Sequence, residues 1–173
     1  TVLKIYLNRV LELEKIKGIE YVTVFKNHGK EAGTSIVHSH SQVIAISFIP
    51  EFIKKEIEAS KNPCIFCKMI KNKKNVCFEN KGFIALCPEA SRFVYEVWIV
   101  SKKHIISASE IDTKIIKMLA QILKKTLVRL KDINASYNLE FKTGYCNKKI
   151  HFHLKILPRI NKFAGFELST GAY

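Results

Sequence analysis

Residues His38–Gln42 read His-Ser-His-Ser-Gln, and residues 151–155 read His-Phe-His-Leu-Lys. Each segment places two histidines two positions apart, and each comes after a loop that contains glycine and asparagine. The first histidines of the two segments are 113 residues apart (151 − 38). The predicted elements in the rest of the chain can be ordered relative to these two segments.

The residues in front of the two segments also follow one order. Apolar side chains at helical spacing predict helices over 3–17 and 115–131. Runs rich in β-branched and aromatic residues predict strands at 21–25 and about 139–145, and we expect each His-x-His segment to open a further strand. The helix end precedes the histidine by 21 residues in one case (38 − 17) and by 20 in the other (151 − 131). The order and spacing predict an internal repeat.

The second copy has a front portion that the first copy lacks. It holds the pair Cys64 and Cys67, a predicted strand at 83–86, and another at 93–100 that leads to His104. Subtracting the period of 113 from 64 gives −49. We therefore expect the matching part of the first copy to precede Thr1, so that the first repeat is truncated at its N-terminus.

These patterns predict an α+β fold in which two similar units form antiparallel sheets with packed helices. Residues 1–49 are expected to be the C-terminal part of the first unit. Residues 50–63, which are rich in charge and contain two prolines, suit a linker or connecting helix. Residues 64–173 are expected to form the second unit.

The first histidine segment suits phosphoryl chemistry. Alternate residues of a strand share a face, so His38, His40 and Gln42 are expected to point the same way. A neutral imidazole such as that of His40 can attack phosphorus and split one displacement into two easier ones. Gln42 can donate hydrogen bonds to a phosphoryl oxygen but no proton, which suits a leaving group such as a sugar phosphate. The alternative is a polar strand face that simply meets solvent.

Four later residues are candidate metal ligands. Cys64 and Cys67 have the separation of a zinc knuckle, and His104 and His151 can supply imidazoles from later elements. A closed Cys₂His₂ site would staple the start of the second unit to its last strand. The alternative is two buried thiols and unrelated histidines. Cys146 lies near His151 in sequence, but proximity alone does not establish a nucleophilic thiol.

Composition sets broader bounds. The formal net charge of +14 favours polyanionic partners, although lysines in a chain rich in Ile and Asn also suit an ordinary solvated surface. Five cysteines, an odd number, argue against a disulfide framework. The sequence shows neither an apolar run long enough to span a membrane nor a signal peptide. We expect a cytoplasmic protein without a membrane partner.

The region from Phe25 to Ser35, with His38–Gln42 after it, resembles the active-site stretch of the galactose-1-phosphate uridylyltransferase family, a branch of the histidine triad superfamily. The second copy also resembles a histidine triad module. The matching segments there are Cys64–Cys67, Val100–His104, His151–His153 and Leu157–Arg159. Together these matches span nearly the whole chain.

The resemblance implies roles for the first segment. His40 becomes nucleotidylated, Gln42 steadies the phosphoryl group, and His38 ligates a zinc ion whose other ligands precede the chain. Histidine triad hydrolases carry a third histidine where this chain has Gln42 and Lys155, which favours transfer over hydrolysis and implies a second copy without catalytic activity. Ser39 departs from the proline usual in the uridylyltransferases.

Further contacts are implied for the substrate. Asn27, Gly33 and Ser35 are candidate substrate contacts in a loop whose glycines and Ser35 would let backbone amides approach phosphate oxygens. The segment 162–167 is similar to one that reaches the sugar in a neighbouring subunit's site. Glu167 is therefore a candidate hexose contact, and a homodimer is implied.

The expected function is a ping-pong transfer. His40 takes a nucleoside monophosphate from a nucleoside-diphosphate sugar, and a second sugar 1-phosphate accepts it. An adenylyl-transferring phosphorylase that acts on ADP-glucose or a dinucleoside polyphosphate is the alternative within the superfamily. In a different class, the charge of +14 would suit a non-catalytic, zinc-stapled module that binds nucleic acid, although nucleic acid is the less favoured partner.

Overall fold

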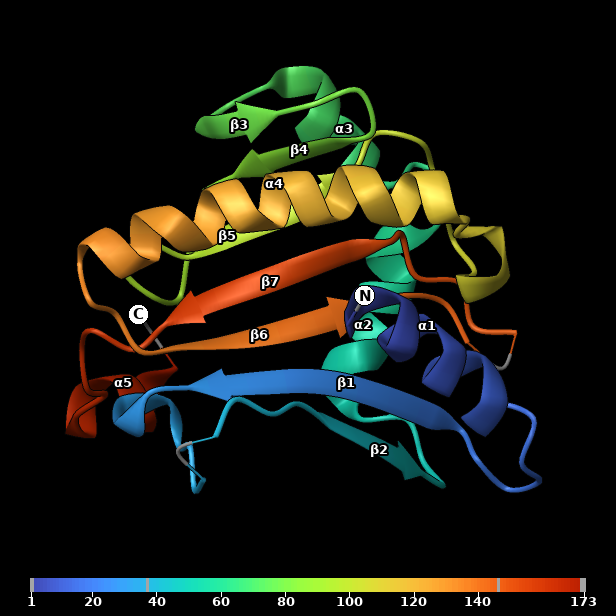
Figure 1. Cartoon of the computed structure of the whole chain (residues 1–173), viewed down its shortest axis with the longest axis horizontal. Coiled ribbons are helices and arrows are strands. Elements are labelled where there is room, and N and C mark those ends of the chain that lie inside the picture. Colours follow the sequence, from blue (N-terminus) through green and yellow to red (C-terminus); the bar gives the residue numbers. More distant parts are fainter. Residues whose placement is uncertain (1, 37, 146, 172–173) are drawn as a thin grey trace.

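A computed structural model describes residues 2–36, 38–145 and 147–171. Within these residues, seven strands form one antiparallel sheet in the order β2-β1-β6-β7-β5-β4-β3 (Figure 1). The strands are β1 (Tyr21–His28), β2 (Gln42–Ile46), β3 (Val76–Glu79), β4 (Phe83–Leu86), β5 (Val97–Ser101), β6 (Tyr137–Lys142) and β7 (His153–Pro158). The helices are α1 (Val2–Leu13), α2 (Glu51–Ser60), α3 (Ile65–Asn72), α4 (Thr113–Asp132) and α5 (Gly165–Thr170), with short 3-10 turns at Lys30–Ala32 and Ala108–Glu110.

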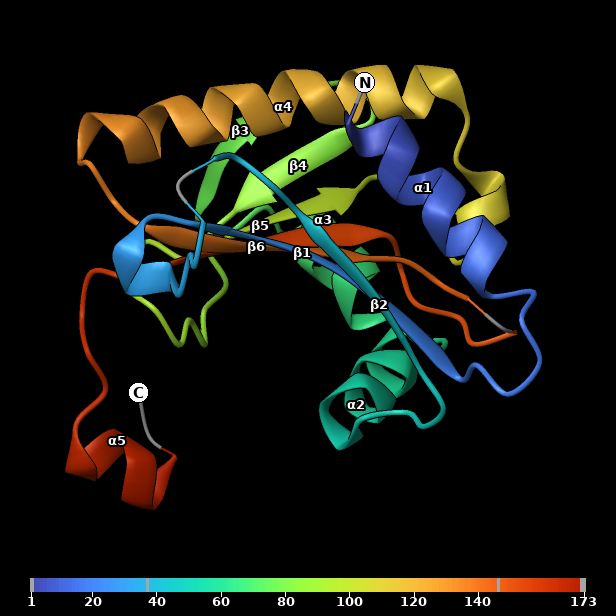
Figure 2. The same cartoon turned by 60° about the horizontal axis from the view of Figure 1, so that its bottom comes forward.

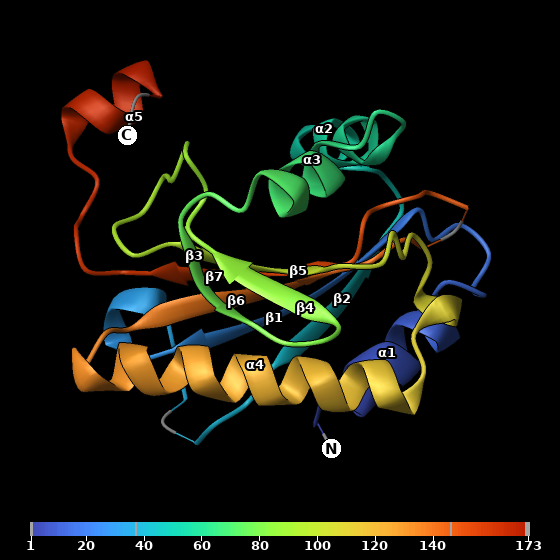
Figure 3. The same ribbon diagram turned by 90° about the horizontal axis from the view of Figure 1, so that it is seen from above.

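Helices cover both faces of the sheet. Helices α1 and α4 pack on one face, and α2 and α3 lie on the other (Figure 3). Helix α4 begins where the Asp112 carboxylate accepts a hydrogen bond of 2.7 Å from the Ile115 amide. Its apolar stripe, which includes Leu119 and Ile122, is buried against the sheet, and each such side chain contributes about 1.5–3 kcal/mol by leaving water. The α+β prediction is confirmed.

Strands β4 and β7 are covered on both faces. Strand β4 is buried at all four of its positions, and β7 at all six. Strand β4 is apolar throughout, as a strand covered on both faces usually is, whereas β7 also buries His153 and Lys155. No helix in the described part of the chain is long and apolar enough to cross a membrane.

Strands β1 and β6 join the two parts of the chain that were assigned to the proposed units. Lys26 pairs with Leu139, Phe25 with Glu140 and Asn27 with Asn138 in an antiparallel register. Strand β1 lies within residues 1–49 and β6 within residues 64–173. Both segments therefore contribute to one continuous sheet.

The predicted strand at the first histidine segment is wrong in extent. Strand β2 begins at Gln42, opposite Phe25, and residues 38–41 precede it without ladder pairing. The next residue of β1, Lys26, instead contacts this segment through its side chain, which donates to Ser39 Oγ at 2.6 Å and to the His40 carbonyl at 3.3 Å. The alternation of faces expected for His38, His40 and Gln42 therefore does not apply.

The segment between the two proposed units contains helix α2. Its buried side chains are Ile53, Glu56 and Ser60, on the face toward the sheet. Helix α2 leads through Pro63 to α3, and both helices lie on the same side of the sheet (Figure 2). The residues expected to act as a linker or connecting helix thus contribute to the packed structure.

Candidate functional site

The His40 imidazole is oriented by its own backbone. Its Nδ1 lies 2.9 Å from the His38 carbonyl oxygen. A carbonyl only accepts, so Nδ1 carries the proton and Nε2 of the neutral ring keeps its lone pair. Ser41, the next residue, is hydrogen-bonded through Oγ to the Tyr6 hydroxyl on α1. The segment is thus fixed on both sides, and His40 is half-buried while His38 is exposed.

A polar cleft of about 510 Å³ lies beside this segment. Its walls bring together three of the predicted site residues, Asn27, Ser35 and His38. Lys26 and Thr34 also lie on the walls, and neither was singled out from the sequence. Within the described residues, the buried Thr34 hydroxyl oxygen has no hydrogen-bond partner. Gly33, His40, Gln42 and Glu167 are not among the lining residues.

Gly33 does not lie on the cleft wall, but it sets the backbone conformation of the loop that carries the cleft residues. It ends the short 3-10 turn in the left-handed conformation (φ +78°), which favours glycine. Its carbonyl faces Asn27, whose Nδ2 lies 3.5 Å away. Gly29, at the start of the turn, has φ +83°, and a Cβ there would meet Ser136 Oγ at 2.2 Å. The loop can approach Ser136, next to β6, because position 29 is glycine, whereas Gly33 allows the left-handed turn.

Asn27 belongs to a hydrogen-bonded chain that crosses the sheet. Its Oδ1 accepts from Asn138 Nδ2 at 2.8 Å, and the same nitrogen donates to the Ala32 carbonyl at 2.9 Å. Arg159 Nε in turn donates to Asn138 Oδ1 at 2.5 Å. Asn27 is therefore held by β6 and by the end of β7. Asn138 and Arg159 could be found only from the register of the strands.

Lys26 is the main contact between β1 and the histidine segment. Partial burial lowers the pKa of its ammonium group. The lysine binds Ser39, the residue that stands where the uridylyltransferases usually have proline, and the His40 carbonyl. A cross-strand contact thus restrains the backbone at the position where a proline would otherwise do so.

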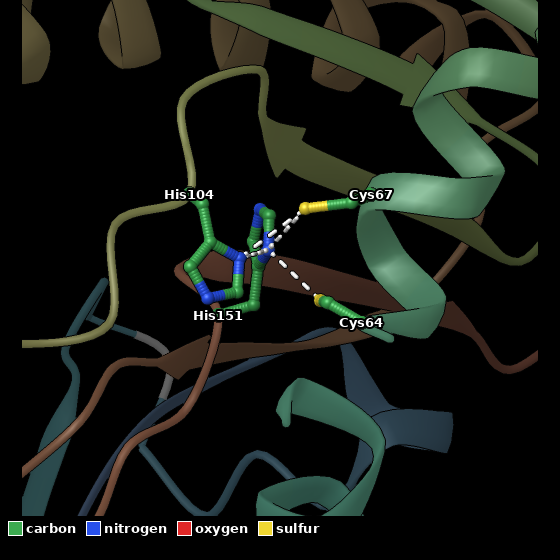
Figure 4. A group of neighbouring side chains, drawn as sticks. All are labelled: Cys64, Cys67, His104 and His151. Carbon is green, nitrogen blue, oxygen red and sulfur yellow. Dashed lines mark hydrogen bonds between the residues drawn. The ribbon is translucent and has the colours of Figure 1, made fainter. Parts of the chain in front are cut away.

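Cys64, Cys67, His104 and His151 converge from three separate places in the chain (Figure 4). Cys64 precedes α3, Cys67 lies on it, His104 follows β5, and His151 precedes β7. The two imidazole Nδ1 atoms are 3.1 Å apart, and Cys67 Sγ lies 3.2 Å from Nδ1 of His104 and 3.7 Å from that of His151. Cys64 Sγ is 3.4 Å from His151 Nδ1. Such a group can hold a metal ion.

The surrounding contacts prepare His151 as a ligand. Its Nε2 donates to the Ser101 carbonyl at 2.8 Å, so Nδ1 carries the lone pair that faces the two sulfurs. Burial lowers the pKa of His151 to about 4, which keeps the ring neutral. Its backbone amide donates to Ser60 Oγ at 2.9 Å, and Ser60 donates to the Glu56 carbonyl. Helix α2 thus fixes the backbone of this residue.

His153 repeats the hydrogen bond of His40 but not its surroundings. Its Nδ1 lies 2.7 Å from the His151 carbonyl, at the same separation of two residues. The ring is completely buried, and Phe66 of α3 stacks on it with centroids 4.5 Å apart. Burial is also the main cause that holds the pKa of His153 well below its ordinary value. Within the described residues its Nε2 has no hydrogen-bond partner.

Lys155, two residues further on, is buried as well. Its ammonium group forms an ion pair with Glu56 of α2. The same nitrogen lies 4.9 Å from the centroid of Phe52 and 4.5 Å from that of Trp98, distances at which a cation is attracted to an aromatic face. Side chains of α2, α3 and β5 therefore cover the second histidine segment.

Three predicted residues stand apart from these clusters. Glu167 lies on α5, which projects from the body of the protein (Figures 2 and 3), and its carboxylate accepts from the Ala164 amide at 2.9 Å. Backbone hydrogen bonds lower the pKa of Glu167. His38 does not belong to the metal-ligand group found among the described residues. Cys146 lies outside the residues that the structure describes.

The fold is that of proteins resembling galactose-1-phosphate uridylyltransferase: the solved structure of such a protein from Arabidopsis thaliana superposes with a TM-score of 0.90 at 30% identity, over 99% of this chain and 62% of that one. The ADP-glucose phosphorylase structure from Arabidopsis thaliana with bound ADP-glucose superposes with a TM-score of 0.90 at 29% identity, over 99% of this chain and 60% of that one. The chain belongs to the family described as a domain of unknown function, DUF4921, whose model matches residues 7–173.

Curated relatives agree with this assignment. The ADP-glucose phosphorylase of Arabidopsis thaliana is 30% identical over 97% of this chain and 52% of its own length. The galactose-1-phosphate uridylyltransferase of Thermotoga maritima is 28% identical over 98% of this chain and 60% of its own length. Both names denote enzymes that transfer nucleotidyl groups. The chain spans between half and three fifths of the length of these two relatives.

Proposed function

We propose that this chain carries the nucleophile of a nucleotidyl-transferring enzyme that acts on a nucleoside-diphosphate sugar. The observation that carries the proposal is the hydrogen bond from His40 Nδ1 to the His38 carbonyl, because it leaves Nε2 as a nucleophile on a half-buried ring. The similarity to two enzymes of this class supports the same role.

The first step transfers the nucleotidyl group to the histidine. The Nε2 lone pair of His40 forms a bond to the α-phosphorus, and the phosphorus–oxygen bond to the sugar 1-phosphate breaks. The electron pair leaves with the sugar 1-phosphate, which needs no proton to depart. Gln42, at the start of β2, suits this step because its amide can donate to a phosphoryl oxygen without acting as an acid.

The second step regenerates the histidine. An acceptor phosphate oxygen attacks the phosphorus of the nucleotidyl-histidine, and the electron pair of the breaking phosphorus–nitrogen bond returns to Nε2. With a hexose 1-phosphate as acceptor, such as galactose 1-phosphate, the product is a new nucleoside-diphosphate sugar. With inorganic phosphate as acceptor, the product is a nucleoside diphosphate, the outcome of a phosphorylase.

The phosphates are proposed to bind in the polar cleft. Lys26, Asn27, Thr34 and Ser35 line it, and they offer cationic and neutral donors to anionic oxygens. Glu167 remains the candidate contact to the hexose. It lies outside this cleft on the projecting α5, so this role requires the site of a second subunit, as in a homodimer.

We further propose that Cys64, Cys67, His104 and His151 hold a zinc ion. Zinc bonds of about 2.3 Å to sulfur and 2.0–2.1 Å to nitrogen place tetrahedral ligand atoms roughly 3.3–3.8 Å apart. Four of the six separations between the ligand atoms, at 3.1–3.7 Å, match this range within a few tenths of an ångström, and all four atoms lie within 4.8 Å of one another. Four protein ligands would leave no position for substrate, so these residues would hold the ion as a structural link between α3 and the segment before β7.

The two relatives differ in the base and the acceptor. The adenylyl-transferring phosphorylase is the second candidate, because the relative that is 30% identical is an ADP-glucose phosphorylase. Incubating the chain separately with ADP-glucose and UDP-glucose, without acceptor, and measuring its intact mass tests both candidates. We expect an increase of one adenylyl or uridylyl group that is lost in His40→Asn. The absence of an adduct with both nucleotide sugars would contradict the proposal.

A further inference from the structure

A second pair of cysteine thiols lies outside both histidine segments. Cys77 on β3 and Cys87, directly after β4, have their sulfur atoms 3.6 Å apart (strands in Figure 1). Both are free thiols. The register between β3 and β4 shifts between Val76 and Phe78, so Cys77 lies at a β-bulge, which redirects side chains at the edge of a sheet.

The backbone on both sides of this thiol pair is fixed. The Cys87 amide donates to the Asn75 carbonyl at 3.0 Å, two residues before Cys77. Beside it, Lys74 and Glu89 form an ion pair of 2.8 Å between the same two stretches of chain. The sulfurs are therefore held near each other by contacts that do not depend on the thiols.

The surroundings distinguish this pair from Cys64 and Cys67. The metal-ligand group found in the described part of the chain contains the first pair with two histidines, and it includes neither Cys77 nor Cys87. Both Cys77 and Cys87 instead line an apolar cavity of about 320 Å³, with Leu130 of α4 on its wall. A disulfide requires a sulfur–sulfur bond of about 2.05 Å. The cavity leaves space for the side-chain rotation that closes the remaining gap.

We propose that Cys77 and Cys87 form a reversible intramolecular disulfide, with a low-molecular-weight disulfide as the oxidant. The Cys77 thiolate attacks one sulfur of the reagent, which forms a mixed disulfide and expels one thiolate. The Cys87 thiolate then attacks Cys77 Sγ and expels the second. Two protein thiols are oxidised, the reagent is reduced to two thiols, and the two thiol protons balance the two expelled thiolates.

Exposure and pKa favour this order of attack. Cys77 is exposed, so the reagent can reach it first, whereas Cys87 is partly buried. Burial, followed by the hydrogen bond to Cys77, raises the pKa of the Cys87 thiol to about 11. Its thiolate is scarce near neutral pH, which makes an external attack at Cys87 slow. The Cys87 thiolate can instead attack the Cys77 sulfur, which lies 3.6 Å away.

The bond would secure an edge of the sheet. Strand β3 has four residues and a single strand neighbour, β4, among the described elements, and short edge strands open readily. A covalent link to the end of β4 restricts such opening. We expect amide exchange over Val76–Glu79 to slow severalfold on oxidation, without a change at the histidine segments.

The test is oxidation of the zinc-loaded chain with excess glutathione disulfide, followed by peptide mapping. We expect a linked peptide pair that contains Cys77 and Cys87, an intact mass lower by two hydrogens, and full reversal by dithiothreitol. Cys87→Ser should stop at a mixed disulfide that retains one glutathione on Cys77. A wild-type chain that keeps both thiols, or that accumulates the mixed disulfide at Cys77, would overturn the proposal.

Discussion

The two His-x-His segments share one local geometry and differ in what covers them. In both, the second histidine places Nδ1 2.7–2.9 Å from the carbonyl of the first. His40 is half-buried beside a polar cleft, whereas His153 is fully buried under Phe66. Two positions further along, Gln42 is half-buried and Lys155 is tied to Glu56.

The orientation of each histidine ring and its access to a ligand are set by different contacts. The hydrogen bond within each segment selects the nitrogen that keeps a lone pair, and the segment supplies this bond itself. Access to the second segment is restricted by α2 and α3, whose residues Phe52, Glu56 and Phe66 contact Lys155 and His153. We infer that one geometry serves chemistry in the first segment and packing in the second.

Breaking the metal-ligand group tests the structural role of the second segment with the largest expected effect. Cys64→Ser removes one of four ligands, and we expect loss of bound zinc and a fall in unfolding free energy on the order of 5 kcal/mol. Metal analysis and urea unfolding measure both. Cys77→Ser, an exposed thiol outside the group, is the control. A zinc content that is unchanged in Cys64→Ser would refute the assignment.

A matched pair of substitutions compares Lys155 with Gln42, the position that the proposed repeat assigns to it. Lys155→Met leaves the buried Glu56 without its ion-pair partner and should lower the unfolding free energy by about 3 kcal/mol. Gln42→Met, at the corresponding position of the first segment, should change it by less than about 0.5 kcal/mol while slowing adduct formation. Chemical denaturation gives both values. Equal destabilisation by the two substitutions would contradict the inference that the second segment serves packing and the first does not.

The smallest of these effects is expected at Lys26. Lys26→Met removes the contacts to Ser39 and to the His40 carbonyl, so we expect adduct formation to slow about tenfold, equivalent to about 1.4 kcal/mol. The exposed Lys30→Met, which lies on the same cleft, controls for the lost charge. If both variants slow the reaction equally, Lys26 acts through its charge and does not position the histidine.

Local pattern was enough to predict much of the fold. The sequence marked α4 within two residues at its start and the strand at 83–86 as it stands in the structure, because long amphipathic or continuously apolar runs carry strong signals. Helix α1 ends at Leu13, four residues earlier than expected, and β3 was not recognised. A four-residue strand with a bulge has too little periodicity to be seen.

The candidate site was likewise predicted from the sequence only in part. The sequence predicted Cys64 and Cys67 from their spacing and His104 and His151 as imidazoles from later elements, and the structure brings the ligand atoms of these four residues within 4.8 Å of one another. The role of Lys26 could not be read from the sequence, because its partners lie 13 and 14 residues away and depend on where β2 stops pairing. The covering of His153 by Phe66 depends on the packing of α3, which the repeat alone does not specify.

The most direct test of the account is to map the nucleotidylated residue by mass spectrometry. The chain is incubated with ADP-glucose or UDP-glucose, digested at neutral to alkaline pH, and the modified peptide is sequenced. We predict that the adduct lies on His40 and that His153 is unmodified, because only the first ring is accessible. An adduct on His153, or modification that persists in His40→Asn, would contradict the account.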